Sequence, residues 1–455
     1  MADSGSATVV TATADCGDSD TKVDPIPESV RLCIFAPPST PAEGFERTAN
    51  YAKGPEQYLK KALGEDVFDQ RKDLLSLPEI VDRDGYGDGK HKSHFEDHVA
   101  KLFGKEAGLF FITGVQAQLA ALKILCTRAS NPRVAWHVSC HLESAEERAY
   151  EELYGLQRIL AGSSPDALPT VQEIKTLLEL PADERPAVLL LELPNRNLGC
   201  ATFTFDELVE ISSACKTAGV VLHCDGARIW EIEPYYQALS GKTFKDIAQL
   251  FDTIYMSFYK ALQGASGAML LANDKTVIAD AKMWQRRAGG NAFSLAYQVI
   301  DSERGYNENI GTFARKREKM IEVASGIKAA TKDKKAPDGQ RIVQFMPDDT
   351  TCCQTRTAFC GYSPEDIYAA RDVVASKTGV RVLERVWPKQ TLDEMLALDR
   401  KGMKPEAVSN GTDEVHRHEI EWMMMSVTEK IPTKTFVDGY VALCDALLAG
   451  RDKSQ

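Results

Sequence analysis

The chain has 455 residues and a net charge of −12, and 44% of its residues are hydrophobic while 26% are charged. This length and balance are typical of an ordinary soluble globular protein with two domains. The negative charge disfavours binding to nucleic acid or to anionic membranes, because like charges repel. Apolar runs long enough to cross a bilayer are missing from the sequence, so we expect no membrane partner. A small-molecule function is favoured.

The cysteines and the N-terminal segment predict the compartment. The chain contains 11 cysteines without a C-x-x-C pair, which is typical of scattered thiols and not of a disulfide framework or a zinc site. Residues 1–24 are rich in Ala, Ser, Thr and Asp and lack a basic stretch followed by an apolar one. We therefore expect a disordered tail without a secretory signal, a reducing compartment and a cytoplasmic location.

The segment before the first expected strand is rich in turn-forming residues. Residues 25–54, with three prolines near their centre, predict a loop-like arm that lies on a partner subunit. Residues 81–88 form a second turn-rich loop. This loop leads into Ser93 and Glu96, whose spacing predicts a capping box at the start of a helix.

Residues 107–118 combine an apolar run, a Thr-Gly turn and a helical pattern. Backbone N–H groups at a helix N-terminus bind phosphate, so Thr113, Gly114 and Val115 are candidate phosphate-binding residues. By itself this pattern is better explained as an ordinary strand-to-helix turn. Only the motifs farther along the chain favour the phosphate site.

Two further strands end in polar residues. Residues 134–138 predict a strand, and His141 opens the helix expected to run to residue 154. His141 is interpreted equally well as a helix-start histidine or as a side chain that stacks on a cofactor ring. The apolar run 186–193 ends in polar residues, Glu192, Asn195 and Asn197, which are candidates to contact cofactor or substrate. Turn chemistry explains the two asparagines nearly as well. A helix capped at residues 204–207 should then run to residue 219.

The most informative stretch is residues 220–228, an apolar run that ends in Asp225, followed by Gly226 and Arg228. A second apolar run, residues 251–258, is followed by Lys260. Parallel strands deliver such residues to one edge of a sheet, where ligands bind. A carboxylate and an amine there are what pyridoxal phosphate requires, the first for its ring nitrogen and the second for its aldehyde. His223, inside the first run, is interpreted as a core histidine.

Alternating strands and helices predict a mainly parallel α/β sheet, followed by a smaller α+β domain. After Gly290 we expect one long helix to the late 320s, then short strands near 342–346, 357–362 and 380–386, and a final helix over 433–448. The predicted boundaries are 1–24 for the tail, 25–54 for the arm, 55–325 for the large domain and 326–455 for the small one.

From residue 82 to 290 the chain resembles the threonine aldolase and β-eliminating lyase group of pyridoxal-phosphate enzymes, which have the aspartate-aminotransferase-like fold with a seven-stranded-type sheet. The most specific likeness is His223-x-Asp225-Gly226-Ala227-Arg228 followed by Tyr259-Lys260. The loop at 84–88, the turn at 113–114 and the pair at 140–141 match the family in order and spacing.

The resemblance implies a role for each motif residue. Lys260 would hold pyridoxal phosphate as the internal aldimine, Asp225 would pair with the ring nitrogen, and Arg228 would contact the ring hydroxyl. His141 would stack on the ring, and the turn at 113–115 would hold the phosphate. The resemblance also implies a small-molecule amino-acid substrate and a homodimer or homotetramer.

Three positions depart from the family pattern. Val115 replaces a hydroxyl residue of the phosphate turn, an arginine expected after Gly290 is replaced near Phe293, and Glu421 stands in the strand where an arginine usually grips the substrate carboxylate. By sequence, the substitutes for that arginine are Arg356, Arg385 and Arg417.

The function predicted is that of a pyridoxal-phosphate-dependent lyase that cleaves a β-hydroxy amino acid to glycine and an aldehyde. Lys260, Asp225 and His141 are the predicted catalytic residues, with His141 the candidate base that takes the β-hydroxyl proton directly or through water. The departures keep two alternatives open. One is β-elimination or another amino-acid transformation on the same cofactor, and the other is a non-catalytic binding or regulatory relative.

Overall fold

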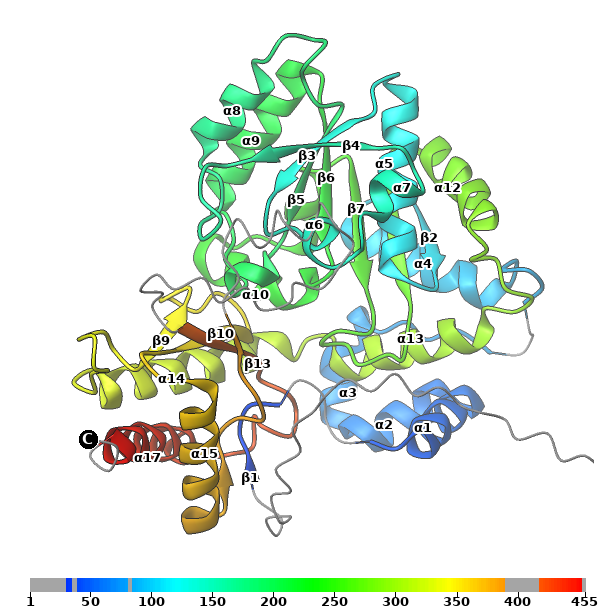
Figure 1. Ribbon diagram of the computed structural model, residues 1–455. Helices are drawn as coiled ribbons and strands as arrows, with labels where there is room; N and C mark the ends of the chain where they lie inside the picture. The colour runs from blue at the N-terminus through cyan, green and yellow to red at the C-terminus, as the bar shows by residue number, and fades with distance from the viewer. Residues whose placement is uncertain (1–29, 35–38, 81–83, 389–416, 452–455) are drawn as a thin grey trace, which may run out of the picture.

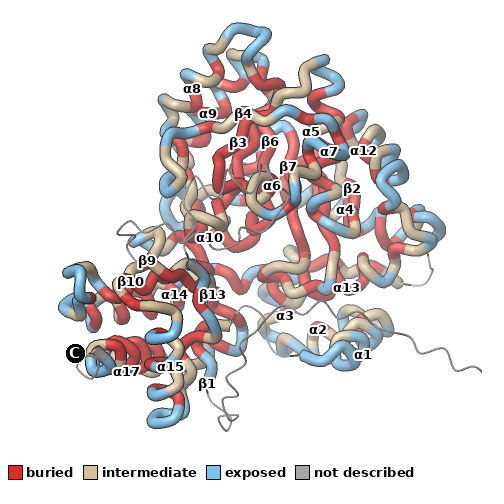
Figure 2. The backbone as a smooth tube through the Cα atoms, in the orientation of Figure 1, coloured by how far each residue is buried: buried red, intermediate tan, exposed pale blue. Residues whose placement is uncertain are grey.

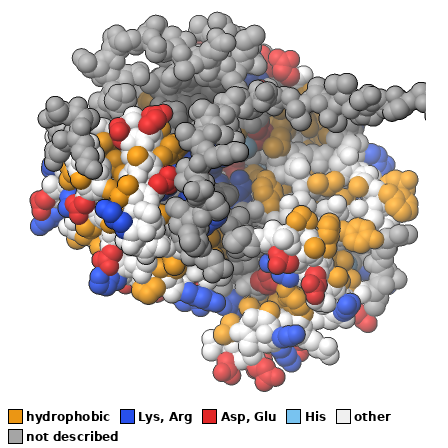
Figure 3. Space-filling model, turned by 60° about the horizontal axis from the view of Figure 1, so that its bottom comes forward, with side chains coloured by type: hydrophobic (Ala, Val, Ile, Leu, Met, Phe, Trp, Pro, Cys, Tyr) orange, Lys and Arg blue, Asp and Glu red, His pale blue; other side chains and the backbone are white. Residues whose placement is uncertain are grey.

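The structure is a computed structural model that describes residues 30–34, 39–80, 84–388 and 417–451 (Figure 1). The tail predicted at 1–24 lies outside these ranges, as do parts of the arm predicted at 25–54. Within them, no helix has the length and apolar character needed to span a bilayer. Figure 3 shows acidic and basic side chains interspersed over the coloured part of the face that it presents.

A seven-stranded sheet forms the centre of the large domain, with the strand order β2-β8-β7-β6-β5-β3-β4. Its strands are β2 (Ala107–Phe111), β3 (Arg133–His137), β4 (Gln157–Ala161), β5 (Val188–Glu192), β6 (Val221–Gly226), β7 (Thr253–Ser257) and β8 (Ala268–Ala272). Only β8 runs antiparallel to its neighbours within this sheet. The mainly parallel α/β sheet is thereby confirmed, and the carboxyl ends of β2, β3, β5, β6 and β7 share one edge.

Both faces of the sheet are buried. In β5, Leu189 and Leu191 join one apolar cluster and Val188 and Leu190 join the other, because successive side chains of a strand point to opposite faces. Figure 2 shows the buried strands enclosed by helices that are exposed on their outer sides. One face packs on α5 (Gly114–Arg128) and α12 (Lys275–Arg287), and the other on α4 (Lys90–Phe103), α8 (Val171–Leu178), α9 (Phe205–Ala218), α10 (Ile229–Ser240) and α11 (Phe244–Ala248).

A four-stranded antiparallel sheet forms the smaller α+β domain that was predicted. Its order is β12 (Trp387–Pro388), β13 (Arg417–Met423), β10 (Gln354–Cys360) and β9 (Val343–Met346). The helices α14 (Phe313–Thr331), α15 (Pro364–Thr378) and α17 (Thr433–Arg451) pack around it. The α14 helix also contacts α10 of the large domain, so the two domains share a packed boundary.

The N-terminal arm is more helical than expected. Residues 41–53 form α1 (Pro41–Lys53), and α2 (Pro55–Leu63) and α3 (Glu65–Arg71) follow it. The expectation of a loop up to residue 54 is therefore wrong. The cause is a complete capping box between Thr40 and Glu43, which the adjacent prolines obscured in the sequence. Before it, β1 (Val30–Arg31) pairs in parallel with β11 (Val380–Arg381).

Three expected helices differ in their bounds. The capping box at Ser93 is wrong, because α4 begins at Lys90 and Glu96 instead accepts a hydrogen bond from the Phe110 N–H at 2.7 Å. The helix expected from 140 to 154 is two short ones, α6 (His141–Ser144) and α7 (Ala149–Glu152). The long helix after Gly290 is also two, α13 (Ala296–Asn309) and α14, separated where Gly311 adopts a φ of 77°.

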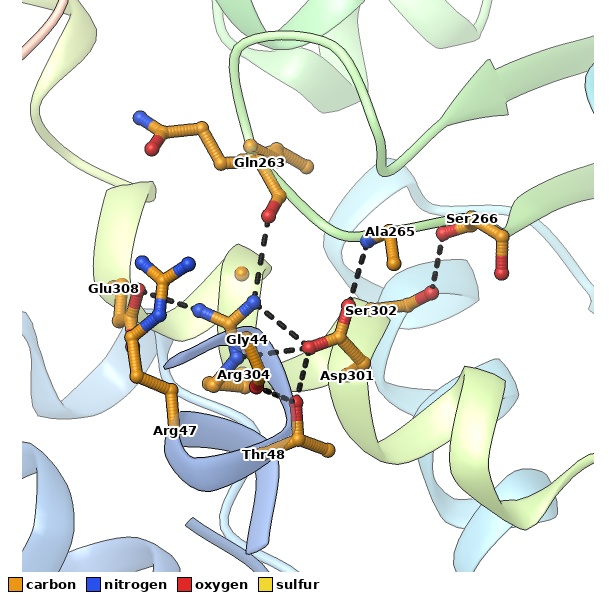
Figure 4. A network of polar contacts seen from close by, with 12 residues as sticks. Gly44, Arg47, Thr48, Gln263, Ala265, Ser266, Asp301, Ser302, Arg304 and Glu308 are labelled. Atoms are coloured by element: carbon orange, nitrogen blue, oxygen red, sulfur yellow. Dashed lines mark hydrogen bonds and ion pairs between the residues drawn. The ribbon is translucent and has the colours of Figure 1, made fainter. Parts of the chain in front are cut away.

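A buried ion pair in α13 connects α1 to the loop after Lys260 (Figure 4). The guanidinium of Arg304 donates to Asp301 Oδ1 from Nε at 3.0 Å and from Nη2 at 2.8 Å. The same carboxylate accepts the Thr48 hydroxyl at 2.5 Å and the Ala265 N–H at 2.6 Å. Because these partners come from three segments, we infer that Asp301 and Arg304 hold the lysine loop in place.

Replacing Arg304 with methionine is expected to lower the apparent free energy of unfolding by about 3–5 kcal/mol, because Asp301 would lose its buried counter-ion. Denaturant titration followed by fluorescence measures the change. The matched control is Arg128→Met, which breaks partly exposed pairs with Asp280 and Asp274 and should cost at most about 1 kcal/mol. Equal losses in the two variants would contradict the structural role assigned to Arg304.

Candidate active site

Three side chains form a row across the carboxyl ends of adjacent strands. Glu192 of β5 pairs in register with Asp225 of β6, which pairs in register with Tyr255 of β7. Register partners on parallel strands point to the same face, so the two carboxyl groups are neighbours. Burial and the Asp225 carboxylate raise the pKa of Glu192 to about 7. Asp225 is itself buried, and its Oδ1 accepts the Ala227 N–H at 3.0 Å.

Lys260 lies three residues after the end of β7 at the same edge of the sheet. Burial and the nearby guanidinium groups of Arg228 and Arg196 lower the pKa of its ammonium to about 8, although Asp225 opposes the shift. A lysine with such a pKa supplies a neutral, nucleophilic amine near neutral pH. The structure thus brings the predicted acid and amine to one site.

Covalent capture of pyridoxal phosphate by the cofactor-free protein is expected to accelerate as pH rises through about 8. Below this pH Lys260 is an ammonium and cannot attack the aldehyde, whereas above it the amine is neutral and the rate should level off. The growth of visible absorbance with time, recorded at each pH, gives the midpoint. A midpoint near 10.5, the value for an ordinary lysine, would contradict the environment described.

Arg228 connects this edge to the small domain. Its side chain is buried, with Nε donating to Gln354 Oε1 at 2.9 Å and Nη2 lying 3.7 Å from Glu421 Oε1. Gln354 and Glu421 belong to β10 and β13. The guanidinium is therefore held between the domains, and its contact with a ring hydroxyl stays a prediction.

The predicted phosphate turn is the start of α5. Gly114 is its first residue, and Thr113 caps it by accepting the Gln116 N–H at 3.3 Å. A methyl group at Gly114 would lie 1.8 Å from the Tyr255 hydroxyl, so only glycine allows the backbone to approach that tyrosine. Val115 is partly exposed and contributes its backbone N–H alone. The turn has the backbone donors of a phosphate site, as predicted.

Replacing Gly114 with alanine is expected to weaken binding of pyridoxal phosphate at least tenfold, roughly 1.4 kcal/mol, because the methyl group forces the turn away from Tyr255. Equilibrium dialysis of the cofactor measures the effect. Gly44→Ala is the matched control, since nothing lies within 4 Å of a methyl group added there. Unchanged affinity for pyridoxal phosphate in Gly114→Ala would show that this turn does not bind the phosphate.

His141 begins α6 after β3 and is one-third exposed. Its Nδ1 lies 2.8 Å from Oε1 of the buried Glu146. A carboxylate accepts hydrogen bonds, so Nδ1 carries the proton and Nε2 has the free lone pair. The imidazole is therefore oriented by Glu146, a contact that the sequence did not reveal, whereas the role of His141 as a base was predicted from the sequence and stays a prediction.

Two other polar residues of the predicted set have structural contacts. The Asn195 side chain is buried, exchanges hydrogen bonds with the Ser139 hydroxyl at 3.0 and 3.2 Å, and caps the turn η2 (Arg196–Leu198). Its contact with a cofactor stays a prediction. His223 is a core histidine as expected, with Nδ1 2.7 Å from the Thr253 hydroxyl and a pKa that burial lowers to about 3.

A cavity of about 710 Å³ lies between the two domains. Ser139 and Ser144, on either side of His141, line it from the large domain. Charged side chains of Arg196, Arg356, Arg417, Glu419 and Glu421 also line it. Of the three arginines proposed as substitutes from sequence, two therefore reach the cavity, and Arg385 instead lies over the ring of Trp387, 4.7 Å from its centroid.

Several residues of the site were not identified from the sequence. Arg196, Tyr255 and Glu146 carry no motif of their own, and their importance follows from contacts with distant segments. Glu192 was predicted, with Asn195 and Asn197, to contact cofactor or substrate, and the polar end of its apolar run was the one available signal. Its pairing in register with Asp225 is seen only in the structure.

The residues present fit pyridoxal phosphate. A glycine turn that cannot carry a methyl group would hold the phosphate, Asp225 would meet the ring nitrogen, Arg228 the ring hydroxyl, and Lys260 the aldehyde carbon. The Oε2 atom of Glu192 is buried and has no hydrogen-bond partner among the described residues, as expected beside a polar ligand. In the part of the chain that the structure describes, no cluster of His, Cys, Asp and Glu is arranged to hold a metal ion.

Comparison with known proteins agrees with this geometry. The family model of the β-eliminating lyases matches residues 79–348. The low-specificity L-threonine aldolase of Saccharomyces cerevisiae is 28% identical over 45% of this chain and 52% of its own length. The alanine racemase TOXG of Cochliobolus carbonum is 29% identical over 56% of this chain and 59% of its own length. The matches thus span little more than half of these curated relatives.

A solved structure extends the likeness to nearly the whole chain. A protein of Listeria monocytogenes described as a candidate L-allo-threonine aldolase has a TM-score of 0.71 and 26% identity, with 92% of this chain and 97% of that chain covered. The threonine aldolase of Leishmania major shares the fold, with a TM-score of 0.58 at 16% identity, over 85% of this chain and 96% of that chain.

Proposed function

Because the chain belongs to the β-eliminating lyase family of pyridoxal-phosphate-dependent proteins, we propose that it cleaves the Cα–Cβ bond of a threonine-like β-hydroxy amino acid. The products are glycine and an aldehyde. The observation that carries the proposal is the convergence of Asp225, Lys260 and the Glu146-oriented His141 at one sheet edge beside a cavity. The first two suit the cofactor, and the third suits a substrate hydroxyl.

When bound, pyridoxal phosphate supplies an electron sink for the pair released from the Cα–Cβ bond. The residues of the chain set up that chemistry. Asp225 places a negative charge at the ring nitrogen and so keeps a proton there. Lys260 retains the cofactor and is displaced by the substrate amino group. The low pKa of Lys260 lets the displaced amine stay neutral and accept or return a proton.

His141 is the proposed base for the β-hydroxyl proton. Its Nε2 takes the proton as the Cα–Cβ bond breaks and the aldehyde forms, and the positive charge that develops on the ring is stabilised by the Glu146 carboxylate 2.8 Å from Nδ1. The Cα of the product then receives one proton, so that atoms balance as β-hydroxy amino acid to glycine plus aldehyde.

The proposal is tested with purified cofactor-loaded protein and a set of amino acids: L-threonine, L-allo-threonine, L-serine and L-alanine. Equal amounts of glycine and acetaldehyde from either threonine isomer are the expected result. Pyruvate and ammonia from serine would favour β-elimination instead. D-Alanine from L-alanine would favour racemisation, the activity in the name of the Cochliobolus carbonum relative. Loaded protein that turns over none of them would favour the non-catalytic alternative.

The homodimer or homotetramer and the cytoplasmic location stay predictions. Sedimentation of the cofactor-loaded protein at several concentrations tests the first, and imaging of the tagged full-length chain in cells tests the second. A monomer at micromolar concentration would contradict the expected assembly.

A further inference from the structure

The receptor for the substrate carboxylate is the part of the site that the family motifs leave unassigned. In the proposed reaction, the carbon that bears the substrate amino group also bears its carboxylate. Because that amino group displaces Lys260, the receptor must lie near Lys260 and must also face the space where substrate enters. The arginines that line the cavity, Arg196, Arg356 and Arg417, differ in how well they meet these two conditions.

Arg196 meets both conditions. It lines the cavity, and its side chain is about one-third exposed there. Its positive charge also contributes to lowering the pKa of Lys260. The backbone N–H of Arg196 donates to Glu192 Oε1 at 2.9 Å. Arg196 therefore lies next to Glu192, the strand neighbour of Asp225.

The guanidinium of Arg196 is already oriented by a carboxylate. Its Nε donates to Glu421 Oε1 at 2.9 Å, and its Nη2 lies 2.6 Å from Glu421 Oε2, which is the two-pronged geometry of an arginine–carboxylate pair. Two of its five N–H donors serve this pair, and the remaining three lie on the Nη1 and Nη2 side. That side presents a second two-pronged edge to an incoming carboxylate.

Glu421 does not repel such a carboxylate strongly, because its charge is shared among several guanidinium groups. Burial favours its neutral form, yet Arg228, Arg196 and Arg356 keep the pKa of Glu421 below its usual value. The Arg228 and Arg356 nitrogens lie 3.7 and 4.0 Å from its oxygens. Glu421 therefore serves as the counter-ion of a positive cluster.

The other arginines are placed less well for this role. Arg228 is fully buried and committed to Gln354 and Glu421. Arg356 donates to Glu419 at 3.1 Å and to Asn197 at 3.0 Å. Arg417, also on the small domain, lies 3.4 Å from Glu419. Arg196 and Arg228 both extend from the large domain, which also carries Lys260, and of these two only Arg196 lines the cavity.

We propose that Arg196 binds the α-carboxylate of the amino-acid substrate. This assignment rests on one part of the proposed function, namely that the amino group of an amino acid displaces Lys260 from the cofactor. It means that the carboxylate is held from the segment after β5, by an arginine that Glu421 of β13 orients through direct contact.

The test compares an amino acid with the amine that lacks its carboxylate. Glycine and methylamine are titrated into cofactor-loaded protein, and the change in visible absorbance gives each dissociation constant. In Arg196→Gln, the constant for glycine should rise roughly 30-fold or more, whereas that for methylamine should stay within about threefold. Arg196→Lys, which keeps the charge but not the two-pronged edge, should lie between Arg196→Gln and the wild type.

Arg356→Gln and Arg417→Gln are the matched controls, since each removes an arginine that lines the same cavity from the small domain. A loss of glycine binding in Arg356→Gln with none in Arg196→Gln would overturn the assignment, as would a wild type that binds glycine no better than methylamine. Wild-type protein that binds glycine but releases no aldehyde from either threonine isomer would overturn the proposed reaction and leave the assignment of Arg196 standing. Cofactor absorbance and thermal unfolding show whether each variant is folded and loaded.

Discussion

Replacing Lys260 with alanine is expected to abolish covalent retention of pyridoxal phosphate and to lower glycine release at least about a thousandfold. Lys260 is the half-buried amine at the sheet edge whose pKa burial and two arginines lower to about 8, so that about half of it is neutral at that pH. Without Lys260, no amine is present at the site to bind pyridoxal phosphate covalently or to displace the product from it. Borohydride treatment followed by intact mass measurement should add the reduced cofactor to the wild type and not to the variant.

A second lysine provides the control for reactivity alone. Burial also lowers the pKa of Lys105 to about 8, but its Nζ donates to the Phe251 carbonyl at 2.5 Å, away from the row of acids. Peptide mapping after borohydride treatment should place the label on Lys260 and leave Lys105 unmodified. A label on Lys105, or retained turnover in Lys260→Ala, would contradict the assignment of Lys260.

Replacing Asp225 with asparagine is expected to lower turnover by about 10²–10⁴-fold, while the protein stays folded. An amide keeps the oxygen that accepts the Ala227 N–H, so the local turn should survive. It lacks the negative charge needed to hold a proton on the ring nitrogen, and the electron sink is weakened. Turnover is measured as aldehyde release, and cofactor loading is measured by visible absorbance.

The neighbouring acid is the matched control for this charge. Glu192 pairs in register with Asp225 and is also buried, but burial and Asp225 raise its pKa to about 7, so about half of it is neutral at pH 7. Glu192→Gln should therefore reduce turnover less than Asp225→Asn. The reverse order would indicate that Glu192, and not Asp225, pairs with the ring nitrogen. A loss of turnover smaller than tenfold in Asp225→Asn would contradict the role proposed for Asp225.

Local patterns were predicted well where one interaction decides them. The start of α5 at the Thr-Gly turn and the capping box between Thr204 and Glu207 follow from hydrogen bonds within a few residues. Two local predictions were wrong for opposite reasons. Thr40 and Glu43 form a box that the surrounding prolines obscured. Ser93 and Glu96 have the spacing of a capping box, but the Glu96 carboxylate instead accepts a hydrogen bond from the Phe110 N–H, 14 residues away.

The direction of β8 and the break before α14 were beyond local reasoning. An apolar run such as residues 268–272 has the same composition whether it is parallel or antiparallel to its neighbours, so only packing decides that β8 reverses. Likewise the helical pattern continues from α13 into α14, and the positive φ of Gly311 turns the chain toward the small domain.

The sequence by itself determined the cofactor end of the site. Asp225, Lys260 and Gly114 each follow a strand, and parallel strands bring their carboxyl ends to one edge whatever the details of packing. Only the tertiary structure decided the substrate end. Arg196 and Glu421 are 225 residues apart and meet because two domains close on one cavity. Neither residue carries a local pattern that predicts the other, since an ion pair across a domain boundary leaves no periodicity in the chain.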